Sequence, residues 1–284
     1  MGSPEIGASE VRGLKASPVE GIPRALTIAG SDSGGGAGIQ ADLKVFLSLG
    51  CHGMSAITAL TAQNTTGVTG IHPVPPDFVA AQIDAVATDI GIDAAKTGML
   101  ASAEIVEAVA DSISAHGIGS LVVDPVFVAK SRDRLLDRDA VKTLVDLLFP
   151  LATLVTPNLF EAAGLLGTDE PSSVNDMKEA ARALKDLGPT AVLVKGGHLP
   201  GEQAVDVFFD GAEFMEVVGP RFDTEDTHGT GCTLSAAIAA RLAHGDDLEA
   251  AVHAGKRFVS GAIERGLRIG KGHGPVNPGW DLHY

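Results

Sequence analysis

Apolar residues recur along this chain with two alternating spacings. Short apolar runs bounded by turn residues, such as residues 25–29, predict buried strands. Longer segments repeat apolar residues every three or four positions, as Ile39, Leu43 and Phe46 do within residues 39–49, and these predict helices. Further strands are predicted at residues 94–97, 120–123, 154–156 and 191–195, and further helices at residues 77–90, 103–116, 137–149, 158–166, 175–187, 231–244 and 248–268.

The order of these elements predicts the class of fold. Strands that alternate with helices of this length form a mostly parallel sheet covered by helices on both faces. Residues 205–209 and 214–218, split by an Asp-Gly turn, predict instead a hairpin at the edge of the sheet. We therefore expect a three-layer α/β fold with a small edge hairpin. Because no repeat and no low-complexity linker interrupts it, residues 25–284 should form a single domain after a flexible tail at residues 1–24.

The charged residues narrow the classes of partner. The 284 residues include 21 Lys and Arg against 36 Asp and Glu, which gives a net charge of −15 at pH 7. Such a surface repels a phosphate backbone, so we expect no nucleic-acid partner. One or two local cations and backbone N–H groups can still bind a single phosphate group.

The cysteines and the start of the chain indicate the compartment. Cys51 and Cys232 are too few for a disulfide framework, and we expect both to be free thiols in a reducing compartment. The first residues lack a basic start followed by an apolar run, and no stretch reaches the roughly 18 apolar residues of a membrane span. We therefore expect a soluble, cytoplasmic protein with no membrane partner.

Ligands of such a sheet bind where the strands end, so the segments that follow the strands are the candidate site. The first is the glycine-rich segment at residues 30–38, which leads into a helix whose free N–H groups could face an anion or a polar ring. Its glycines do not fit the G-x-G-x-x-G of a dinucleotide fold, because Ile39 occupies the last position. The alternative is a tight turn that only lets strand and helix pack.

A second loop, THGTGCT at residues 227–233, precedes a helix of small residues. Gly229 and Gly231 carry no side chains, so successive backbone N–H groups can converge on a phosphate oxygen at a helix start. This pattern predicts an oxyanion cradle for a transferring phosphoryl group. Cys232, in the first turn, should have a lowered thiol pKa and accept a proton from a substrate hydroxyl; the alternative is a buried small apolar residue.

Charged residues after other strands complete the candidate site. Lys195 can bind phosphates as a point charge, and Glu161 and Asp124 are carboxylates of the kind that bind magnesium near phosphates. The alternatives are a surface lysine, a loop aspartate, and a helix capping box formed by Asn158 and Glu161, although Glu161 can serve both roles. No G-x-x-x-x-G-K-[ST] occurs, so an ATP user of this sequence is not of the P-loop type. The histidines lack partners at zinc-ligand spacing.

These segments belong to a longer series of motifs that runs in order along residues 25–277. The motifs are AGSDSGGGAGIQADLK at 29–44, TAQN at 61–64, KTGML at 96–100, DPV at 124–126, KS at 130–131, TPN at 156–158, VKGGH at 194–198 and THGTGCT at 227–233. Together they resemble the hydroxymethylpyrimidine and hydroxymethylpyrimidine-phosphate kinases of the ribokinase superfamily. The resemblance implies a ribokinase-like fold, the use of ATP and Mg²⁺, and a homodimer. It also implies phosphorylation of 4-amino-5-hydroxymethyl-2-methylpyrimidine, and of its monophosphate to the diphosphate, in thiamine biosynthesis.

The resemblance assigns the pocket for the substrate ring. Gln63 would hydrogen-bond the aminopyrimidine edge, while Gly30, Asp42, Met99 and Val126 would line the pocket. Without the resemblance, Asp42 would be assigned to the solvated surface, Gln63 to a loop and Met99 to the core.

The resemblance also assigns the phosphate side of the site. The γ-phosphate would be attacked in line by the hydroxymethyl oxygen, and backbone amides with magnesium would stabilise the developing charge. Cys232 stands where most sugar kinases of the superfamily carry an aspartate base. The implied sets are Asn158, Lys195 and Thr227 for ATP, Glu161 and Asp124 for Mg²⁺, and Gly229, Thr230, Gly231 and Cys232 for catalysis.

Phe127 and Arg132 depart from the family pattern, which usually has Met and Gly at these places. We expect Phe127 to reshape one wall of the ring pocket and Arg132 to stiffen, or add charge to, a loop over the substrate. The nearest rival function is a pyridoxal or pyridoxine kinase, because those substrates also present a hydroxymethyl group. A catalytically silent pyrimidine sensor is disfavoured by the intact phosphate motifs, and a nicotinamide dehydrogenase by the glycine spacing.

Overall fold

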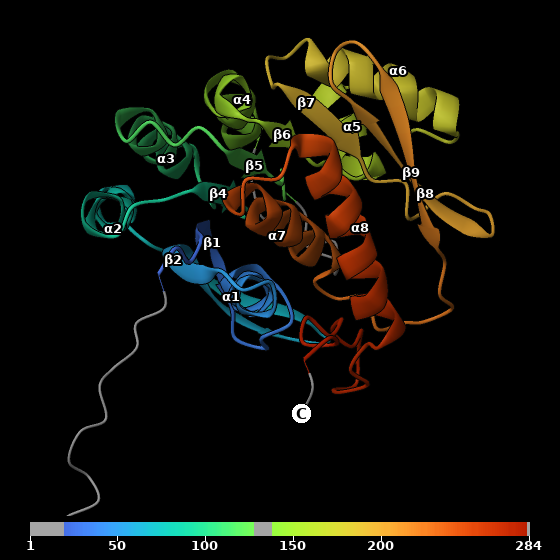
Figure 1. The fold of residues 1–284 in the computed structure, drawn as a ribbon, viewed down its shortest axis with the longest axis horizontal. Helices are drawn as coiled ribbons and strands as arrows, with labels where there is room; N and C mark the ends of the chain where they lie inside the picture. The colour runs from blue at the N-terminus through green and yellow to red at the C-terminus, as the bar shows by residue number, and fades with distance from the viewer. Residues whose placement is uncertain (1–19, 128–137, 283–284) are drawn as a thin grey trace, which may run out of the picture.

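The computed structural model describes residues 20–127 and 138–282, within which nine strands form one sheet (Figure 1). Their order across the sheet is β3-β2-β1-β4-β5-β6-β7-β8-β9. Neighbours from β2 to β7 pair in parallel, whereas β3, β8 and β9 join antiparallel. The strands are β1 (Arg24–Asp32), β2 (His52–Asn64), β3 (Gly67–Pro73), β4 (Ala94–Thr97), β5 (Leu121–Val123), β6 (Leu154–Val155), β7 (Ala191–Val194), β8 (Gln203–Phe209) and β9 (Phe214–Pro220).

Helices cover both faces of this sheet. Within β5, Leu121 and Val123 point into one apolar core and Val122 into the other, because successive side chains of a strand face opposite ways. The core that contains Val122 is closed by α1 (Gly38–Ser48), α7 (Thr230–Ala243) and α8 (Leu248–Glu264). The other core is closed by α2 (Pro76–Asp89), α3 (Ala103–Ala115), α4 (Arg138–Leu147), the 3₁₀ turn η1 (Phe149–Leu151), α5 (Leu159–Leu166) and α6 (Val174–Lys185).

The predicted three-layer α/β fold is therefore confirmed, and so is the predicted hairpin, since β8 and β9 pair antiparallel at the sheet's edge. The first strand begins at Arg24, one residue before the predicted start of the domain. Most of the predicted tail lies outside the described residues. The predicted start of the helix at residue 137 also lies outside them, and α4 is described from Arg138.

Strands β2 and β3 were not among the predicted elements. In β2, Met54, Ala56 and Thr58 are buried on alternate positions, but most residues of the strand are small or polar and give no apolar run. Beyond Thr58, β2 pairs with β3 along its outer half, and only the part beyond Thr61 has no pairing with β1 on its other side. Because this ribbon of β2 and β3 buries little apolar surface, the hydrophobic pattern that identifies the other strands is absent.

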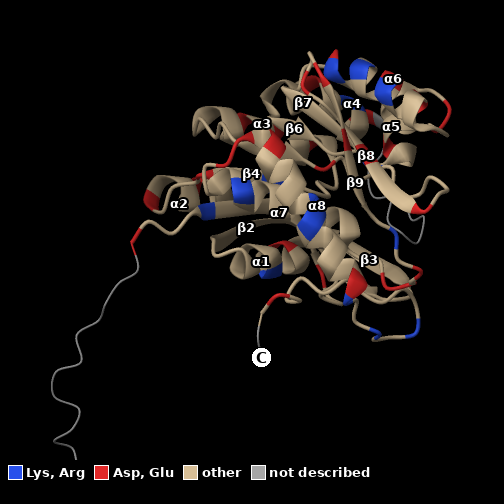
Figure 2. Cartoon of the chain, turned by 45° about the vertical axis from the view of Figure 1, so that its right-hand side comes forward, with Lys and Arg blue, Asp and Glu red and all other residues tan. Residues whose placement is uncertain are grey.

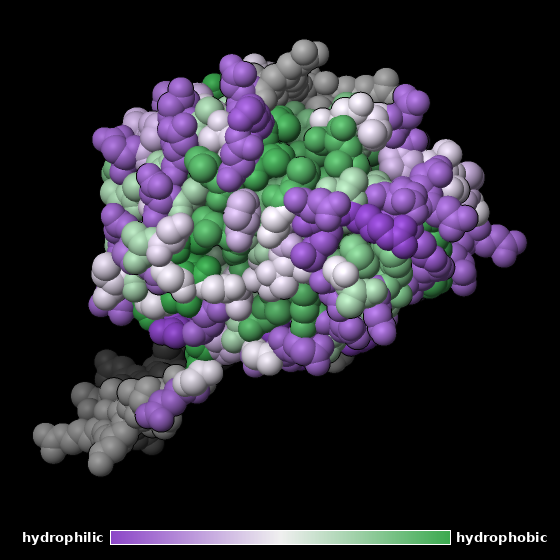
Figure 3. Space-filling view, turned by 90° about the horizontal axis from the view of Figure 1, so that it is seen from above, coloured by the Kyte–Doolittle hydropathy of each residue, from purple (hydrophilic) through white to green (hydrophobic). Residues whose placement is uncertain are grey.

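Charges and apolar residues are interspersed over the surface. In Figure 2, basic residues on α6 and α8 lie among acidic residues of neighbouring helices and loops. Figure 3 shows a face on which apolar residues lie between long hydrophilic side chains. Among the helices of residues 20–127 and 138–282, none combines the length and apolarity that a bilayer crossing requires.

A buried ion pair fixes the edge hairpin to α8 and to the end of β7. The Lys256 ammonium on α8 lies 2.7 Å from a carboxylate oxygen of Asp206 on β8, and both residues are buried. The other oxygen of Asp206 accepts the backbone N–H of Gly196 at 3.0 Å. Because Gly196 follows the last residue of β7 by two positions, the pair determines where the polypeptide turns at that strand end.

Replacing Lys256 by Met should destabilise the protein by about 3 kcal/mol, because it leaves the Asp206 carboxylate buried without its cation. Chemical unfolding monitored by circular dichroism measures this change. The matched control is Lys178→Met, which removes the more exposed Lys178–Glu216 pair and should cost less than about 1 kcal/mol. Adding Asp206→Asn to Lys256→Met should recover part of the loss, and a double variant less stable than the single one would contradict the explanation.

Candidate active site

Buried polar side chains gather where the parallel strands end at their carboxyl side. This is the position at which sheets of this kind bind ligands, and a buried polar group there needs a partner or a ligand. The buried members of this group are Asp32, Lys96, Thr97, Asp124 and Thr156.

The ion pair of Asp42 and Lys96 forms the floor of one half of the site. Lys96 Nζ at the end of β4 lies 3.1 Å from Asp42 Oδ2 on α1, and both side chains are fully buried. Thr27 donates to the same oxygen at 2.6 Å, whereas Asp42 Oδ1 is buried without a hydrogen-bond partner. Burial raises the pKa of Asp42, and Lys96 offsets this only in part. The free oxygen is thus placed to accept a hydrogen bond from a ligand, and the alternative assignment of Asp42 to solvated surface is wrong.

Gly30 and Met99 are brought together as predicted for the ring pocket. The Gly30 amide donates to the Met99 carbonyl at 3.2 Å, and a Cβ at Gly30 would approach the Met99 methyl to 2.5 Å. A side chain at Gly30 would therefore displace the Met99 methyl from its place against the backbone. Met99 is buried, so it belongs to the core and to the pocket boundary at once.

Gln63 and Val126, the other two residues assigned to the ring pocket, are held by different parts of the chain. Gln63 lies in β2, not in a loop. Its backbone N–H donates to the Ser33 hydroxyl at 2.8 Å, which fixes the backbone at this position. Its side-chain oxygen lies 3.2 Å from the Thr61 hydroxyl. Val126 follows β5, and its N–H donates to the Asp124 carbonyl at 2.8 Å. Gln63 is thus tied to the glycine-rich segment, and Val126 to Asp124.

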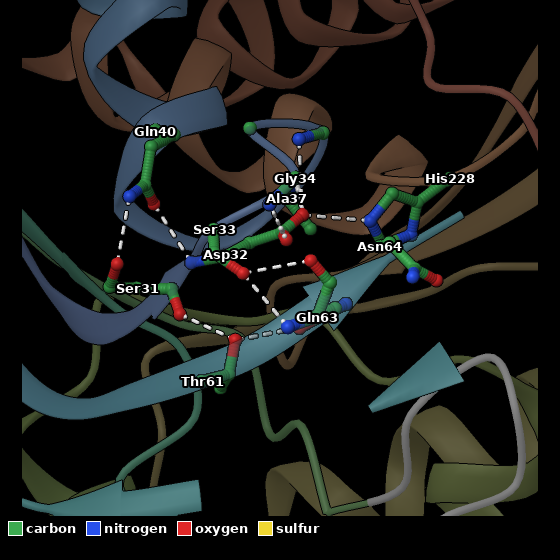
Figure 4. Close-up of polar contacts among 12 residues, drawn as sticks. Ser31, Asp32, Ser33, Gly34, Ala37, Gln40, Thr61, Gln63, Asn64 and His228 are labelled. Carbon is green, nitrogen blue, oxygen red and sulfur yellow. Dashed lines mark hydrogen bonds and ion pairs between the residues drawn. The ribbon is translucent and has the colours of Figure 1, made fainter. Parts of the chain in front are cut away.

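The N–H groups of the glycine-rich segment are largely used within the protein. Asp32 accepts the amides of Gly34 at 2.8 Å, Gly36 at 3.0 Å and Ala37 at 2.8 Å (Figure 4). The Asp32 carboxylate therefore occupies the position in which the sequence analysis expects a bound anion. The expectation that this helix start faces a ligand anion is corrected for these three amides, because an internal carboxylate already satisfies them.

Lys195 lies between two carboxylates in the other half of the site. Its Nζ is 2.8 Å from Asp124 Oδ1 and 3.8 Å from Glu161 Oε2, so it is not a free surface lysine. Burial opposes its charge, but Asp124 and Glu161 raise the pKa of Lys195 above its ordinary value. Asp124 also accepts the Thr156 hydroxyl at 3.1 Å. One ammonium therefore faces two carboxyl groups. When both are ionised, the cluster has a net negative charge that a further cation would neutralise.

Asn158 and Glu161 form the helix capping box that the sequence analysis gave as the alternative to a role in ligand binding. The Asn158 side chain accepts the Glu161 N–H at 2.8 Å, and Glu161 Oε2 accepts the Asn158 N–H at 2.7 Å. Burial raises the pKa of Glu161 to about 7, with Lys195 lowering it and Asp124 raising it further. A carboxyl group in this state would be stabilised in its ionised form by a bound cation. Glu161 and Asp124 therefore offer the oxygen ligands that a hard cation such as Mg²⁺ would need.

The loop of Gly229 to Cys232 opens α7 directly beside these charges. Gly229 has φ +81° as the N-terminal cap, and a Cβ there would approach the Gly36 carbonyl oxygen to 1.8 Å, so glycine is required. A Cβ at Gly231 would lie 3.4 Å from Lys195 Nζ and 3.5 Å from Asp124 Oδ2. The first-turn amides have no acceptor within the helix and are adjacent to a cation, which is the geometry of a phosphate cradle.

Thr227 and Thr230 shape this loop. The Thr230 hydroxyl donates to the Thr227 carbonyl at 2.8 Å, and the Thr230 amide lies 3.4 Å from the same oxygen. These contacts close the turn that precedes the helix. Both residues therefore have a local structural role in addition to the roles that the resemblance implies.

The lowered thiol pKa expected for Cys232 is wrong. Burial raises the pKa of Cys232 to about 11, although Lys96 and a hydrogen bond from the Gly38 amide act in the opposite direction. The helix start therefore does not outweigh the loss of water around the sulfur. Cys232 is mainly a neutral thiol near pH 7.

The two departures from the family pattern have different outcomes. The Phe127 ring lies against α5, where a Cβ at Gly164 would approach it to 2.8 Å and the Phe160 ring centroid is 6.0 Å away. Phe127 thus packs on the helix that carries Glu161, and the contacts of its ring do not support the expected change in the ring pocket. Arg132 and the Lys130-Ser131 motif lie outside the described residues.

Three residues of the site were quoted in motifs but given no role. They are Lys96, Asp32 and His228, and His228 contacts Asp32 at 2.9 Å. A lysine within an otherwise apolar, buried strand is a signal of an internal ion pair, and it could have identified Lys96. The contact between Asp32 and His228 joins residues 196 positions apart in the chain, which no local pattern reveals.

Comparison with known proteins identifies the family of this chain. A family model described as phosphomethylpyrimidine kinase matches residues 32–277. A hydroxymethylpyrimidine/phosphomethylpyrimidine kinase of Bacillus subtilis is 50% identical over 257 residues, covering 90% of this chain and 94% of that protein. A thiamine biosynthesis bifunctional protein of Geobacter sulfurreducens is 55% identical over 252 residues, which cover 89% of this chain and 51% of the relative. This chain therefore spans about half the length of that bifunctional relative.

Solved structures support the same conclusion. A Bacillus subtilis pyridoxal kinase in complex with ADP has a TM-score of 0.86 and 41% identity, and the match covers 91% of this chain and 98% of that one. A phosphomethylpyrimidine kinase of Clostridium difficile has a TM-score of 0.75 and 43% identity, covering 84% of this chain and 99% of that one. These similarities confirm the ribokinase-like fold. By its sequence and its fold, the chain belongs to the phosphomethylpyrimidine kinase family.

Proposed function

We propose that this chain transfers the γ-phosphoryl group of ATP to the hydroxymethyl oxygen of 4-amino-5-hydroxymethyl-2-methylpyrimidine. A second transfer to the monophosphate would give the diphosphate, as a step of thiamine biosynthesis. The observation that carries the proposal is the position of Lys195, between Asp124 and Glu161 and beside the first turn of α7. A cation, two carboxylates and free amides at one place are the parts that phosphoryl transfer uses.

The substrate ring would bind on the side of Asp42. Its unpartnered buried oxygen can accept a hydrogen bond from the exocyclic amino group, and Gly30 and Met99 supply a close, largely apolar wall. Gln63 and Val126 are proposed to complete the pocket. Lys96 holds the Asp42 carboxylate in place, and its own positive charge compensates the carboxylate in a region without solvent.

The phosphates would bind on the side of Lys195. The amides of Gly229 to Cys232 would donate to the oxygens of the transferring group, and Lys195, with Asn158 and Thr227, would orient the nucleotide. Magnesium, when bound through Glu161 and Asp124, would neutralise charge on the phosphates. Since Lys195 already pairs with Asp124, a divalent cation held by Asp124 and Glu161 would share these two carboxylates with the lysine.

The homodimer stays a prediction. The ribbon of β2 and β3 ends the sheet on one side, and it exposes the large apolar side chains of Leu60 and Ile71. This is surface that association with a second copy would cover.

A pyridoxal kinase is the second candidate, because the solved structure of a pyridoxal kinase matches this fold with a TM-score of 0.86. The relatives that are hydroxymethylpyrimidine kinases are more similar in sequence, at 50% identity for the Bacillus subtilis protein. A silent sensor is a weaker candidate, since a protein that only binds the ring needs no Lys195, Asp124 and Glu161 cluster.

Turnover should be seen with the pyrimidine and with its monophosphate. The purified chain is incubated with ATP and Mg²⁺, and phosphorylated products are separated by chromatography with pyridoxal assayed in parallel. We expect the diphosphate from the pyrimidine monophosphate, with a kcat/KM at least about tenfold above that for pyridoxal. Product from pyridoxal alone would assign the chain to the second candidate, and binding of the pyrimidine without ATP consumption would assign it to the sensor.

Replacing Glu161 by Gln should separate its two roles. Gln can keep the capping box but not the charge, so the fold should be retained while the Mg²⁺ concentration for half-maximal rate rises by at least about tenfold. Because a raised carboxyl pKa lowers the stability of the wild type as pH rises from about 4.5 to about 7, Glu161→Gln should unfold at the same or a higher temperature at pH 8 without Mg²⁺. Glu170→Gln, at an exposed position, is the control. An unchanged Mg²⁺ dependence would remove Glu161 from the metal site.

Replacing Cys232 by Ala tests the proposed proton acceptor. Loss of a general base costs about 10²-fold or more in kcat, and the fold should be preserved because the side chain is small. Since the thiol pKa is about 11, the part of kcat that depends on Cys232 should increase about tenfold per pH unit from pH 7 to 9. Cys51→Ala is the control thiol. A nearly normal kcat for Cys232→Ala would leave the amides and Lys195 as the main catalytic groups.

A further inference from the structure

The carboxylate of Asp32 is an internal anion at the start of α1. It is 2% exposed, and it accepts three backbone amides from the segment of residues 34–37. A fourth hydrogen bond comes from His228 Nε2 at 2.9 Å. Because an ionised carboxylate can only accept, His228 carries the hydrogen on Nε2. Figure 4 shows these groups converging on Asp32, with Gln63 and Thr61 of β2 beside them.

The ionised state of Asp32 is supported by its surroundings. Burial alone would raise its pKa, but the hydrogen bond from His228 and those from the Gly34 and Ala37 amides hold the pKa of Asp32 below its ordinary value. The carboxylate is therefore negative across the neutral pH range, and it orders the glycine-rich segment around itself.

His228 is fixed on its backbone side as well. Its N–H donates to the Gly274 carbonyl at 3.0 Å, and its carbonyl accepts the Val276 N–H at 3.0 Å. Its side chain is 14% exposed. The imidazole therefore has little freedom to follow Asp32 if the glycine-rich segment shifts. The hydrogen bond between His228 and Asp32 thus fixes the two segments relative to each other.

The glycine-rich segment before α1 and the loop before α7 are also in close steric contact. A Cβ at Gly36 would approach His228 Cδ2 to 2.5 Å, and one at Gly229 would approach the Gly36 carbonyl oxygen to 1.8 Å. Further along, the Gly38 amide lies close enough to the Cys232 thiol to lower its pKa against the effect of burial. The segment that follows Gly30 and the loop that begins α7 therefore touch at successive points, with no side chain able to separate them.

These two segments carry opposite halves of the proposed reaction. The first runs from Gly30 to the helix of Asp42, and the second carries the amides of Gly229 to Cys232. We infer that Asp32 and His228 are a positioning pair, which holds the phosphate cradle in register with the pocket for the substrate ring. Neither residue is proposed to touch the reacting atoms. The inference rests on the proposed function for its kinetic consequences.

The expected consequence is a loss in kcat rather than in substrate binding. The cradle amides stabilise charge that develops in the transition state, so a small displacement reduces the rate even when both substrates still bind. Misplacement by about 1 Å can cost about 10²-fold in rate. The ring pocket and Lys195 are left intact by changes at His228, so KM should change little.

The test compares two substitutions of His228 that differ in one hydrogen bond. His228→Leu removes the donor, whereas His228→Gln places an amide N–H near the position of Nε2. We expect kcat to fall about 10²-fold in His228→Leu with KM for ATP and pyrimidine within about threefold, and His228→Gln to recover most of the loss. His116→Leu is the matched control, because it breaks an exposed histidine–aspartate pair with Asp84 far along the chain. Equal losses in His228→Leu and His228→Gln, or none in either, would overturn the inference.

A double-mutant cycle tests whether the two residues act as a unit. Asp32→Asn should lower kcat in the same direction, and the double variant with His228→Leu should fall no further than about threefold below the worse single variant. Losses that multiply would show independent roles and contradict the positioning pair.

A readout without catalysis separates this inference from the proposed function. In a Cys51→Ala background, Cys232 is the remaining cysteine of the chain, and its alkylation by iodoacetamide reports on the contact between Gly38 and the sulfur. We expect labelling at least about tenfold faster in His228→Leu than in His228→Gln, because the released loop exposes the thiol. If the wild type turns over neither pyrimidine nor pyridoxal, the proposed function fails, while faster labelling still supports the pair. Equal labelling rates would overturn it.

Discussion

Asp124 accepts hydrogen bonds from the segments that end β6 and β7 and from helix α7, and the geometry of the site depends on these bonds. Its partners are Thr156, Lys195 and Ser235, at 3.1, 2.8 and 3.4 Å. A carboxylate that is 1% exposed is too costly to bury without such compensation. The same bonds that stabilise the buried charge therefore hold Lys195, the proposed phosphate-binding lysine, against the first turn of α7. Stability and function of this edge of the sheet share one set of contacts.

The site contains buried cations although the molecule as a whole is strongly negative. The chain carries a net charge of −15, yet the cations Lys96 and Lys195 are buried where the phosphates and the substrate are proposed to bind. Lys96 pairs with Asp42, which has a second oxygen without a hydrogen-bond partner. Lys195 pairs with Asp124, which also accepts hydrogen bonds from Thr156 and Ser235. The charges of Lys96, Asp42 and Asp124 all act on the Cys232 thiol, and burial keeps it neutral. A neutral thiol adds no negative charge beside the transferring phosphoryl group, and the amides and ammonium groups are the proposed stabilisers of the charge that develops there.

Glycine has two distinct uses in this architecture. In the segment before α1, the absence of side chains allows the backbone to wrap around an internal carboxylate, Asp32. In the loop before α7, it allows the backbone at Gly229 to adopt a positive φ against the Gly36 carbonyl and leaves Gly231 open beside Lys195. The first segment is a structural support and the second is the proposed phosphate cradle, although both are glycine-rich loops that lead into a helix.

The sequence by itself determined the layers of the fold, because hydrophobic periodicity depends on local spacing and the buried strands and amphipathic helices carry it. It also determined the family and the candidate residues at strand ends, since the motifs are local. It did not reveal β2 and β3, whose ribbon buries too little apolar surface to show a pattern. Only the tertiary structure decided that Asp32 fills the glycine-rich segment, that Lys96 pairs with Asp42 and that burial raises the pKa of Cys232. Each of these depends on distances between residues far apart in the chain and on the exclusion of water, and neither is encoded in local spacing.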